Sequence, residues 1–179
     1  MTLRSVLLVM AIALAPATAS AQQADPYRVA SQAVALFQQA CLPFTGSPGD
    51  LRAWASARHL PETSPQQALP FLGGHPGKVY GASTQDGKMA LASEDNGGCR
   101  VVVEFGDKAS VDTALQGAFH QMGAIVLPVN DRGSADGKAS QTLLKVLLGS
   151  RSVLVSTATH VHPEAPSALP TLVMHATGQ

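Results

Sequence analysis

Residues 99–105 read CRVVVEF, and much of the fold can be worked out from this stretch. In an extended chain its odd positions, from Cys99 to Phe105, fall on one face, and its even positions, which include Arg100 and Glu104, fall on the other. Every odd position is apolar, so the stretch predicts a β-strand with one buried face. Cys99 then lies on the core side of a sheet, where a helix packed on that sheet could deliver a second cysteine.

Further extended runs predict more strands, at residues 78–83, 88–93, 124–129, 141–148, 152–159 and 171–176. The first two flank Gln85-Asp86-Gly87, and an Asp-Gly pair between apolar runs is a strong hairpin signal. Residues 130–137 are expected to form a polar connection, and residues 163–170, which are rich in proline, a loop. Most connections are short turns, which favours antiparallel pairing.

Helices are predicted at residues 25–41, 47–60, 64–69 and 110–122. The first three begin with Asp-Pro or Ser-Pro, which supplies a capping side chain and a proline at the first helical position. The first is expected to end at Leu42-Pro43, and the last ends at Gly123, a common C-terminal cap. Together the elements predict a two-layer α+β domain: an antiparallel sheet of about six to seven strands, with the N-terminal helices and one central helix packed on one face.

The N-terminus has the layout of a secretory signal peptide. A positive charge precedes the apolar run 6–14, and Ala19 and Ala21 form a small-residue cleavage site. Cleavage after Ala21 would remove residues 1–21 and leave 22–179 as a single globular α+β domain, in the periplasm or secreted. The apolar run is shorter than the ~20 residues of a permanent anchor, and an uncleaved N-terminal anchor is the alternative.

The two cysteines, Cys41 and Cys99, predict one disulfide. An exported chain meets an oxidising environment, in which an isolated pair of cysteines usually forms a bridge. Chain-entropy arithmetic gives such a bridge roughly 4 kcal/mol for a loop of this length. A catalytic thiol is the alternative, which the even cysteine count disfavours.

Charge and composition argue against several classes of partner. Basic and acidic residues each number 12, so no basic surplus is present to bind a phosphate backbone, and we expect no nucleic-acid partner. No apolar run after the signal reaches membrane-spanning length, so no membrane anchor is expected after cleavage. The sequence lacks the nucleophile-elbow and zinc-protease motifs, and no cofactor is expected.

Residues 73–79, GGHPGKV, look at first like a phosphate-binding loop. Such a loop needs glycine where Leu72 stands, and serine or threonine where Val79 stands. The segment that follows is strand-like, so no helix N-terminus is offered to a phosphate. We interpret the stretch as a turn that brings the chain from the helices into the first strand, and we keep His75 as a possible ligand-binding residue.

Residues 159–164, THVHPE, contain the sharpest metal candidate in the sequence. His160 and His162 are two apart, so on a strand their imidazoles share a face and could bind one metal ion. Glu164 or His175 could complete such a set of ligands. The structural alternative is a polar strand end at a loop.

Four segments resemble a group of small exported bacterial proteins of unknown function. They are FQQAC, LRAWASARHLP, FLGGHPGKVY and LASEDNGGCRV, and the similarity covers about residues 33–105. It rests on Trp54, the Pro-Gly turn and the two cysteines. The resemblance implies export and a disulfide, and it carries no catalytic residue across.

Two functions of different class follow from these observations. The first is a non-enzymatic exported domain that binds a protein partner or a small ligand, with Trp54 as a possible ligand-binding residue. Trp54 is the only tryptophan, and its other interpretation is a core residue. The second is a metal-binding protein or metal-dependent enzyme that uses His160 and His162.

Overall fold

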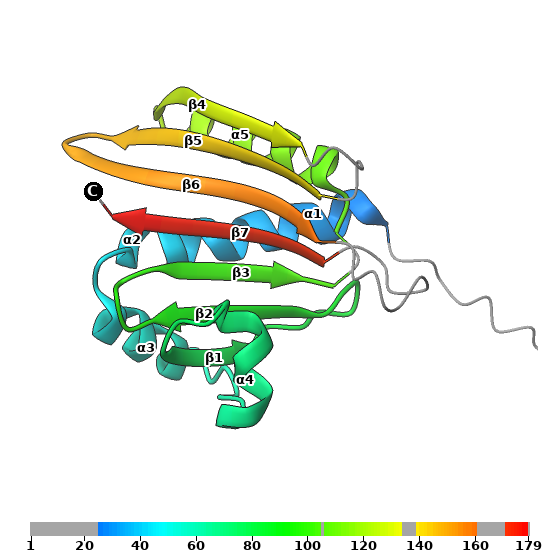
Figure 1. The fold of residues 1–179 in the computed structure, drawn as a ribbon, viewed down its shortest axis with the longest axis vertical. Coiled ribbons are helices and arrows are strands. Elements are labelled where there is room, and N and C mark those ends of the chain that lie inside the picture. Colours follow the sequence, from blue (N-terminus) through cyan, green and yellow to red (C-terminus); the bar gives the residue numbers. More distant parts are fainter. Residues whose placement is uncertain (1–24, 105, 134–138, 161–170, 179) are drawn as a thin grey trace, which may run out of the picture.

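One β-sheet is the frame of the molecule. A computed structural model describes residues 25–104, 106–133, 139–160 and 171–178. Its strands form a seven-stranded antiparallel sheet in the order β1-β2-β3-β7-β6-β5-β4 (Figure 1). The strands are β1 (Gly77–Gly81), β2 (Met89–Glu94), β3 (Cys99–Val103), β4 (Ile125–Gly133), β5 (Ala139–Leu148), β6 (Arg151–His160) and β7 (Thr171–Gly178).

The last strand lies in the middle of the sheet. β7 pairs with β3 on one side and with β6 on the other, so it joins two three-stranded meanders, β1–β3 and β4–β6. Leu172, Met174 and Ala176 are fully buried in the main core, and Met174 lies opposite Val101 of β3 and Thr157 of β6. Alternate residues of β7 therefore face the main core.

Most helical segments cover one face of this sheet. They are α1 (Pro26–Leu36), the π-helical turn η1 (Phe37–Cys41), α2 (Leu42–Phe44), α3 (Pro48–Ala57) and α5 (Lys108–Gln121). Their buried side chains form one continuous core with the strands, in which Phe37 and Phe119 are the largest members. The predicted α+β class, with helices packed on an antiparallel sheet, is confirmed. No helix among the described residues is long and apolar enough to cross a bilayer.

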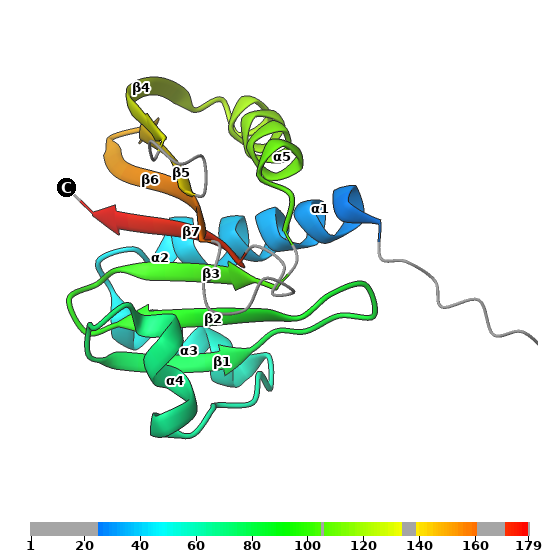
Figure 2. The same ribbon diagram turned by 45° about the vertical axis from the view of Figure 1, so that its right-hand side comes forward.

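One helix, α4 (Pro65–Leu72), lies on the opposite face, as Figure 2 shows. Ala68 and Leu72 pack there against Ala90 of β2 and Val102 of β3. The sequence predicted a shorter third helical piece on the same face as the others. The difference arises because both faces of β2 and β3 carry apolar side chains, so each face needs a cover.

The two edges of the sheet differ in their protection. Residues 61–63 run beside β1, and the Gly81 N–H donates a hydrogen bond to the carbonyl of Pro61 at 2.9 Å. At the other edge, the described part of the chain gives β4 no backbone hydrogen bond beyond those with β5. Ile125 and Leu127 of β4 are 59% and 45% exposed. β4 is therefore an open strand edge with apolar side chains beside it.

Two element boundaries differ from the sequence prediction. The first helix does not end at Leu42-Pro43 but continues through η1 into α2, where Pro43 occupies the first turn and needs no partner for a backbone N–H. The predicted connection 130–137 is wrong over its first part, because Asn130 pairs with Leu143 and β4 runs on to Gly133. A β-bulge after Pro128 allows this continuation.

The disulfide between Cys41 and Cys99 is confirmed, and it ties the helical layer to the sheet. Cys41 ends η1 and Cys99 begins β3, and both side chains are fully buried. Their Cα atoms are 5.2 Å apart, and 58 positions separate them in the sequence. A bridge over so long a loop removes many conformations from the unfolded chain.

We expect loss of this bridge to lower the free energy of unfolding by about 2–5 kcal/mol. Because the same bond is lost each time, Cys41→Ala, Cys99→Ala and the double variant should lose similar amounts, measured by urea unfolding with free thiols alkylated. Denatured wild-type protein should show no reactive thiol before reduction. Two reactive thiols in the unreduced protein would contradict the bridge.

Candidate functional site

A surface cleft of about 630 Å³ lies on the helix-covered side of the protein. Side chains drawn from residues 32–39, 54–61 and 81–89 line it, and we call it the Trp54 cleft. It therefore lies where α1 and η1, the end of α3 and the β1–β2 connection meet. Its volume is within the ~300–1,000 Å³ range of small-molecule sites.

Trp54 and Arg58 form the most distinctive part of the lining. The Arg58 guanidinium carbon lies 4.5 Å from the centre of the Trp54 indole ring, a cation–π contact between residues one helical turn apart. Trp54 also packs against Phe44, with ring centres 6.3 Å apart and planes inclined by 51°. Trp54 is half-buried, so it supports the helical layer and also forms a wall of the cleft.

A chain of side-chain contacts fixes the opposite wall. The Thr84 hydroxyl donates to Gln32 Oε1 at 2.5 Å, and Gln32 Nε2 donates to Asp86 Oδ2 at 2.6 Å. Arg28 Nη2 lies 3.2 Å from the same carboxylate oxygen. These contacts hold the β1–β2 connection against α1, and they also pair the negative charge of Asp86 with a cation.

The rest of the lining is mainly apolar, although Gln39 and Ser83 add polar side chains. Ala35, Leu36, Leu60 and Met89 contribute apolar surface, and Arg58 is the one ionisable side chain among the described residues of the lining. Among the described residues, Arg58 has no carboxylate partner within ion-pair distance. An apolar pocket with a few oriented polar groups is the usual form of a small-molecule site.

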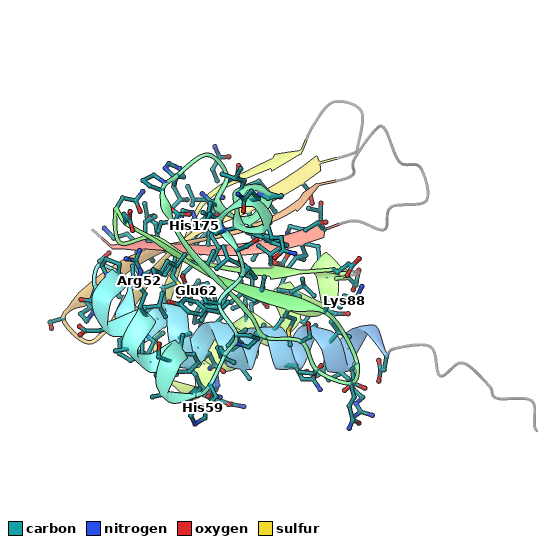
Figure 3. All side chains as sticks on the ribbon, turned by 90° about the horizontal axis from the view of Figure 1, so that it is seen from below. Arg52, His59, Glu62, Lys88 and His175 are labelled. Atoms are coloured by element: carbon teal, nitrogen blue, oxygen red, sulfur yellow. A yellow bond between two sulfur atoms is a disulfide. The ribbon has the colours of Figure 1, made fainter. Side chains whose placement is uncertain are left out.

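A second polar arrangement, the Glu94 cluster, consists of Glu94, Arg100 and His175. The Glu94 side chain is fully buried, and its Oε1 accepts a hydrogen bond from Arg100 Nε. His175 Nε2 lies 3.5 Å from the same oxygen. Figure 3 shows His175 beside the sheet on the side away from α3 and His59, so the Glu94 cluster and the Trp54 cleft lie on different faces.

Glycines make room for the Glu94 cluster. A Cβ atom at Gly98 would lie 2.5 Å from Glu94 Oε2 and 2.9 Å from His175 Nε2, and neither of these two atoms has a hydrogen-bond partner within the described chain. A Cβ atom at Gly73, the left-handed cap of α4, would lie 2.3 Å from Arg100 Nη1. Because Glu94 is buried and paired, we interpret the cluster as a structural tie between β2, β3, β7 and the α4 cap.

The strand register sets His175 apart from His160. His160 ends β6 opposite Thr171, but its side chain and the whole of His162 and Glu164 lie outside the described residues. His175 lies opposite Ser156, four positions from Thr171 along β7, or about 13 Å away. The strand register therefore does not bring His175 to His160. Among the described residues, no three His, Cys, Asp or Glu side chains form a group able to hold a metal ion.

The stretch GGHPGKV behaves as the sequence predicted. Gly73 ends α4, and β1 begins at Gly77, so residues 73–76 form the turn into the sheet. Lys78 lies on β1, and its ammonium group is 3.0 Å from Glu62 Oε1. His75 is exposed in the turn and has no place in the Trp54 cleft.

Several site residues were not singled out from the sequence. Arg58 follows Trp54 by four positions on a predicted helix, and this spacing was a usable signal for their contact. Glu94 and Arg100 lie at the two ends of the short connection between β2 and β3, but the burial of Glu94 depends on α4 covering the second face of the sheet. Gln32 reaches Asp86 across 54 positions, and no local pattern encodes such a contact.

Comparisons with known proteins do not place the chain in a family. No protein-family profile and no curated protein matches the sequence. A solved structure, the Ran-binding protein Mog1p of Saccharomyces cerevisiae, aligns with 67% of this chain and 77% of its own, at 12% identity and a TM-score of 0.32. So low a TM-score carries no argument about fold or function.

The pH dependence of stability can test the Glu94 cluster. Burial lowers the pKa of His175, Arg100 and His75 lower it further, and Glu94 acts in the opposite direction. Because the folded pKa lies below the unfolded value of about 6.5, the contribution of His175 to stability is present above that pH. It is lost as the pH falls through the interval between the two values.

Urea unfolding at several pH values between 8 and 5 should therefore show part of this loss. His175→Gln should give a shallower decline in the free energy of unfolding than the wild type. The exposed His120, changed to Gln, serves as the matched control and should leave the decline unchanged. Equal slopes for wild type and His175→Gln would refute the assignment.

Gly98→Ala should destabilise the fold by about 1–3 kcal/mol, because the new methyl group overpacks against Glu94 and His175. Gly117→Ala is the matched control. Gly117 lies inside α5 with open space around its Cα, so alanine there should stabilise the helix by up to about 1 kcal/mol. Thermal unfolding of both variants measures the difference, and a neutral Gly98→Ala would contradict the close contact.

Proposed function

We propose that this chain is an exported, non-enzymatic binding domain and that a small ligand occupies the Trp54 cleft. The observation that carries the proposal is the concave, mainly apolar lining with Arg58 held over Trp54 and without a carboxylate partner in the described part of the chain. Rigid elements build the cleft, because α1 and α3 belong to the main core and Gln32 fixes the β1–β2 connection. A preformed cleft binds its ligand with little ordering cost.

Export is proposed from the N-terminal sequence and supported by the disulfide. Residues 1–21 have the order of a cleavable signal, ending at Ala21. The buried bridge between Cys41 and Cys99 is compatible with an oxidising compartment, where such bridges persist. The resemblance to small exported bacterial proteins points the same way, so we place the mature protein in the periplasm or outside the cell.

A protein partner is the second candidate class of ligand. The observation that favours it is the open edge of β4, beside which Ile125, Leu127 and Val129 are 59%, 45% and 52% exposed. Exposed strand edges can pair with an extended segment of another chain. The metal alternative with His160 and His162 gains no support from the described residues, and it ranks below both binding functions.

The single tryptophan makes the Trp54 cleft directly observable. Trp54 is the only indole in the sequence, so its fluorescence reports on the cleft alone. In a screen of small molecules of varied charge and polarity, we expect a subset to change Trp54 emission and to raise the melting temperature together. A screen in which no compound does both would contradict the proposal.

A blocking variant shows whether such compounds occupy the cleft. Ala35→Phe adds a ring to the lining and should abolish binding in calorimetry. Ala57→Phe adds the same ring to an exposed position of α3 outside the lining, and it should bind normally. Circular dichroism checks that both variants fold. Binding that survives Ala35→Phe would move the site away from the cleft.

A further inference from the structure

We infer that the ligand of the Trp54 cleft is a small monocarboxylate with an apolar body, and that Arg58 binds its carboxylate. This inference rests on the proposed function and names the class of ligand. It starts from Arg58, the only ionisable group of the lining, which has no carboxylate partner among the described residues. A guanidinium presents its N–H donors in a plane that matches a carboxylate.

The orientation of Arg58 is partly fixed before any ligand arrives. Its guanidinium lies over the Trp54 ring at 4.5 Å, so the indole contacts one face of the cation. The N–H groups at its edge have no side-chain acceptor among the described residues. Arg58 also directly follows α3 as its C-terminal cap residue, so its backbone is held by the helix end. A positioned cation loses less freedom on binding than an unsupported surface arginine.

The other polar groups of the cleft do not compete for this role. Gln32 uses its oxygen to accept from Thr84 and its nitrogen to donate to Asp86, so its amide is already engaged at both ends. Asp86 does not line the cleft, and Arg28 balances its charge. The described lining therefore carries one full positive charge without a carboxylate partner, and a ligand with one negative charge can balance it.

The rest of the lining defines the body of the ligand. Ala35, Leu36, Leu60 and Met89 offer aliphatic surface next to the indole of Trp54. Burial of an aliphatic or mixed aliphatic–aromatic body against these side chains supplies the nonpolar part of the binding free energy. Among the described residues, two further polar side chains are exposed at the cleft: Gln39, from the π-helical turn η1, and Ser83, from the β1–β2 connection.

A phosphate or sulfate ester fits this cleft less well than a carboxylate. Doubly charged phosphates are usually held by several cations or by a helix N-terminus. Here Arg58 is the one cation among the described residues of the lining. The helix end beside it is the C-terminus of α3, whose partial negative charge repels a dianion more strongly than a monocarboxylate. The balance of charges therefore favours the carboxylate.

Three probes with the same chain and different head groups test the charge requirement: octanoate, 1-octanol and octylammonium. We expect octanoate to bind in calorimetry and to change Trp54 emission, 1-octanol to bind at least about tenfold more weakly, and octylammonium to give no measurable heat. A tenfold ratio corresponds to the loss of about one charge-assisted hydrogen bond. Octyl phosphate serves as a fourth probe and should bind more weakly than octanoate.

Variants of Arg58 test whether its guanidinium binds the carboxylate of the ligand. Arg58→Gln should weaken octanoate binding by about tenfold or more, and Arg58→Lys, which keeps the charge, should restore part of the loss. Lys78→Gln is the matched control, because it removes a cation that pairs with Glu62 away from the cleft, and it should bind octanoate normally. Calorimetry is the readout for these variants, since Arg58 itself affects Trp54 fluorescence.

The outcomes separate the inference from the proposed function. Equal affinities for octanoate and 1-octanol, both lost in Ala35→Phe, would overturn the carboxylate inference and leave a ligand-binding cleft. Tighter binding of octyl phosphate, or unchanged octanoate affinity in Arg58→Gln, would also overturn it. Octanoate binding that persists in Ala35→Phe would place the site elsewhere and overturn the proposed function as well.

Discussion

The insertion of β7 between β3 and β6 is the constraint on which the rest of the structure depends. Each three-stranded meander pairs strands that are consecutive in the sequence, but only β7 joins the two meanders into one sheet. The joined sheet gives α1 and α5 a common surface to pack on, and the main core runs under both of them. A sheet broken at β7 would leave two small layers, each with too little apolar surface to bury.

The disulfide and the π-helical turn set the position of the helical layer on that sheet. Cys41 fixes the end of η1 to the start of β3, and the chain then turns at once into α3. The wall of the Trp54 cleft formed by α1 and η1 is therefore held in register with the wall formed by Trp54 and Arg58. The shape of the cleft at this junction is therefore set by the packed helices and the sheet, and no loop has to close over it to form its walls.

The sequence predicted those features that depend on local patterns. The alternation in CRVVVEF, the Asp-Gly turn and the proline-started helices determined most element types, and the burial of both cysteines followed from their place on apolar faces. The sequence did not predict features that depend on contacts between distant segments. Packing against neighbouring elements decides which face of the sheet α4 covers, how far β4 extends towards Gly133, and whether Glu94 is buried. No local spacing in the sequence indicates these contacts.

The central place of the C-terminal strand has a consequence for how the chain acquires its structure. Because β7 follows both meanders in the sequence, a growing chain that has reached only β6 holds both meanders but lacks the strand that joins them. About 70 residues separate β3 and β7 in the sequence, so closing the loop between them costs conformational entropy. We therefore expect the contacts between these two strands to form late in folding. The seven-stranded sheet can therefore be completed only when β7 is free to pair, and until then the two meanders remain separate.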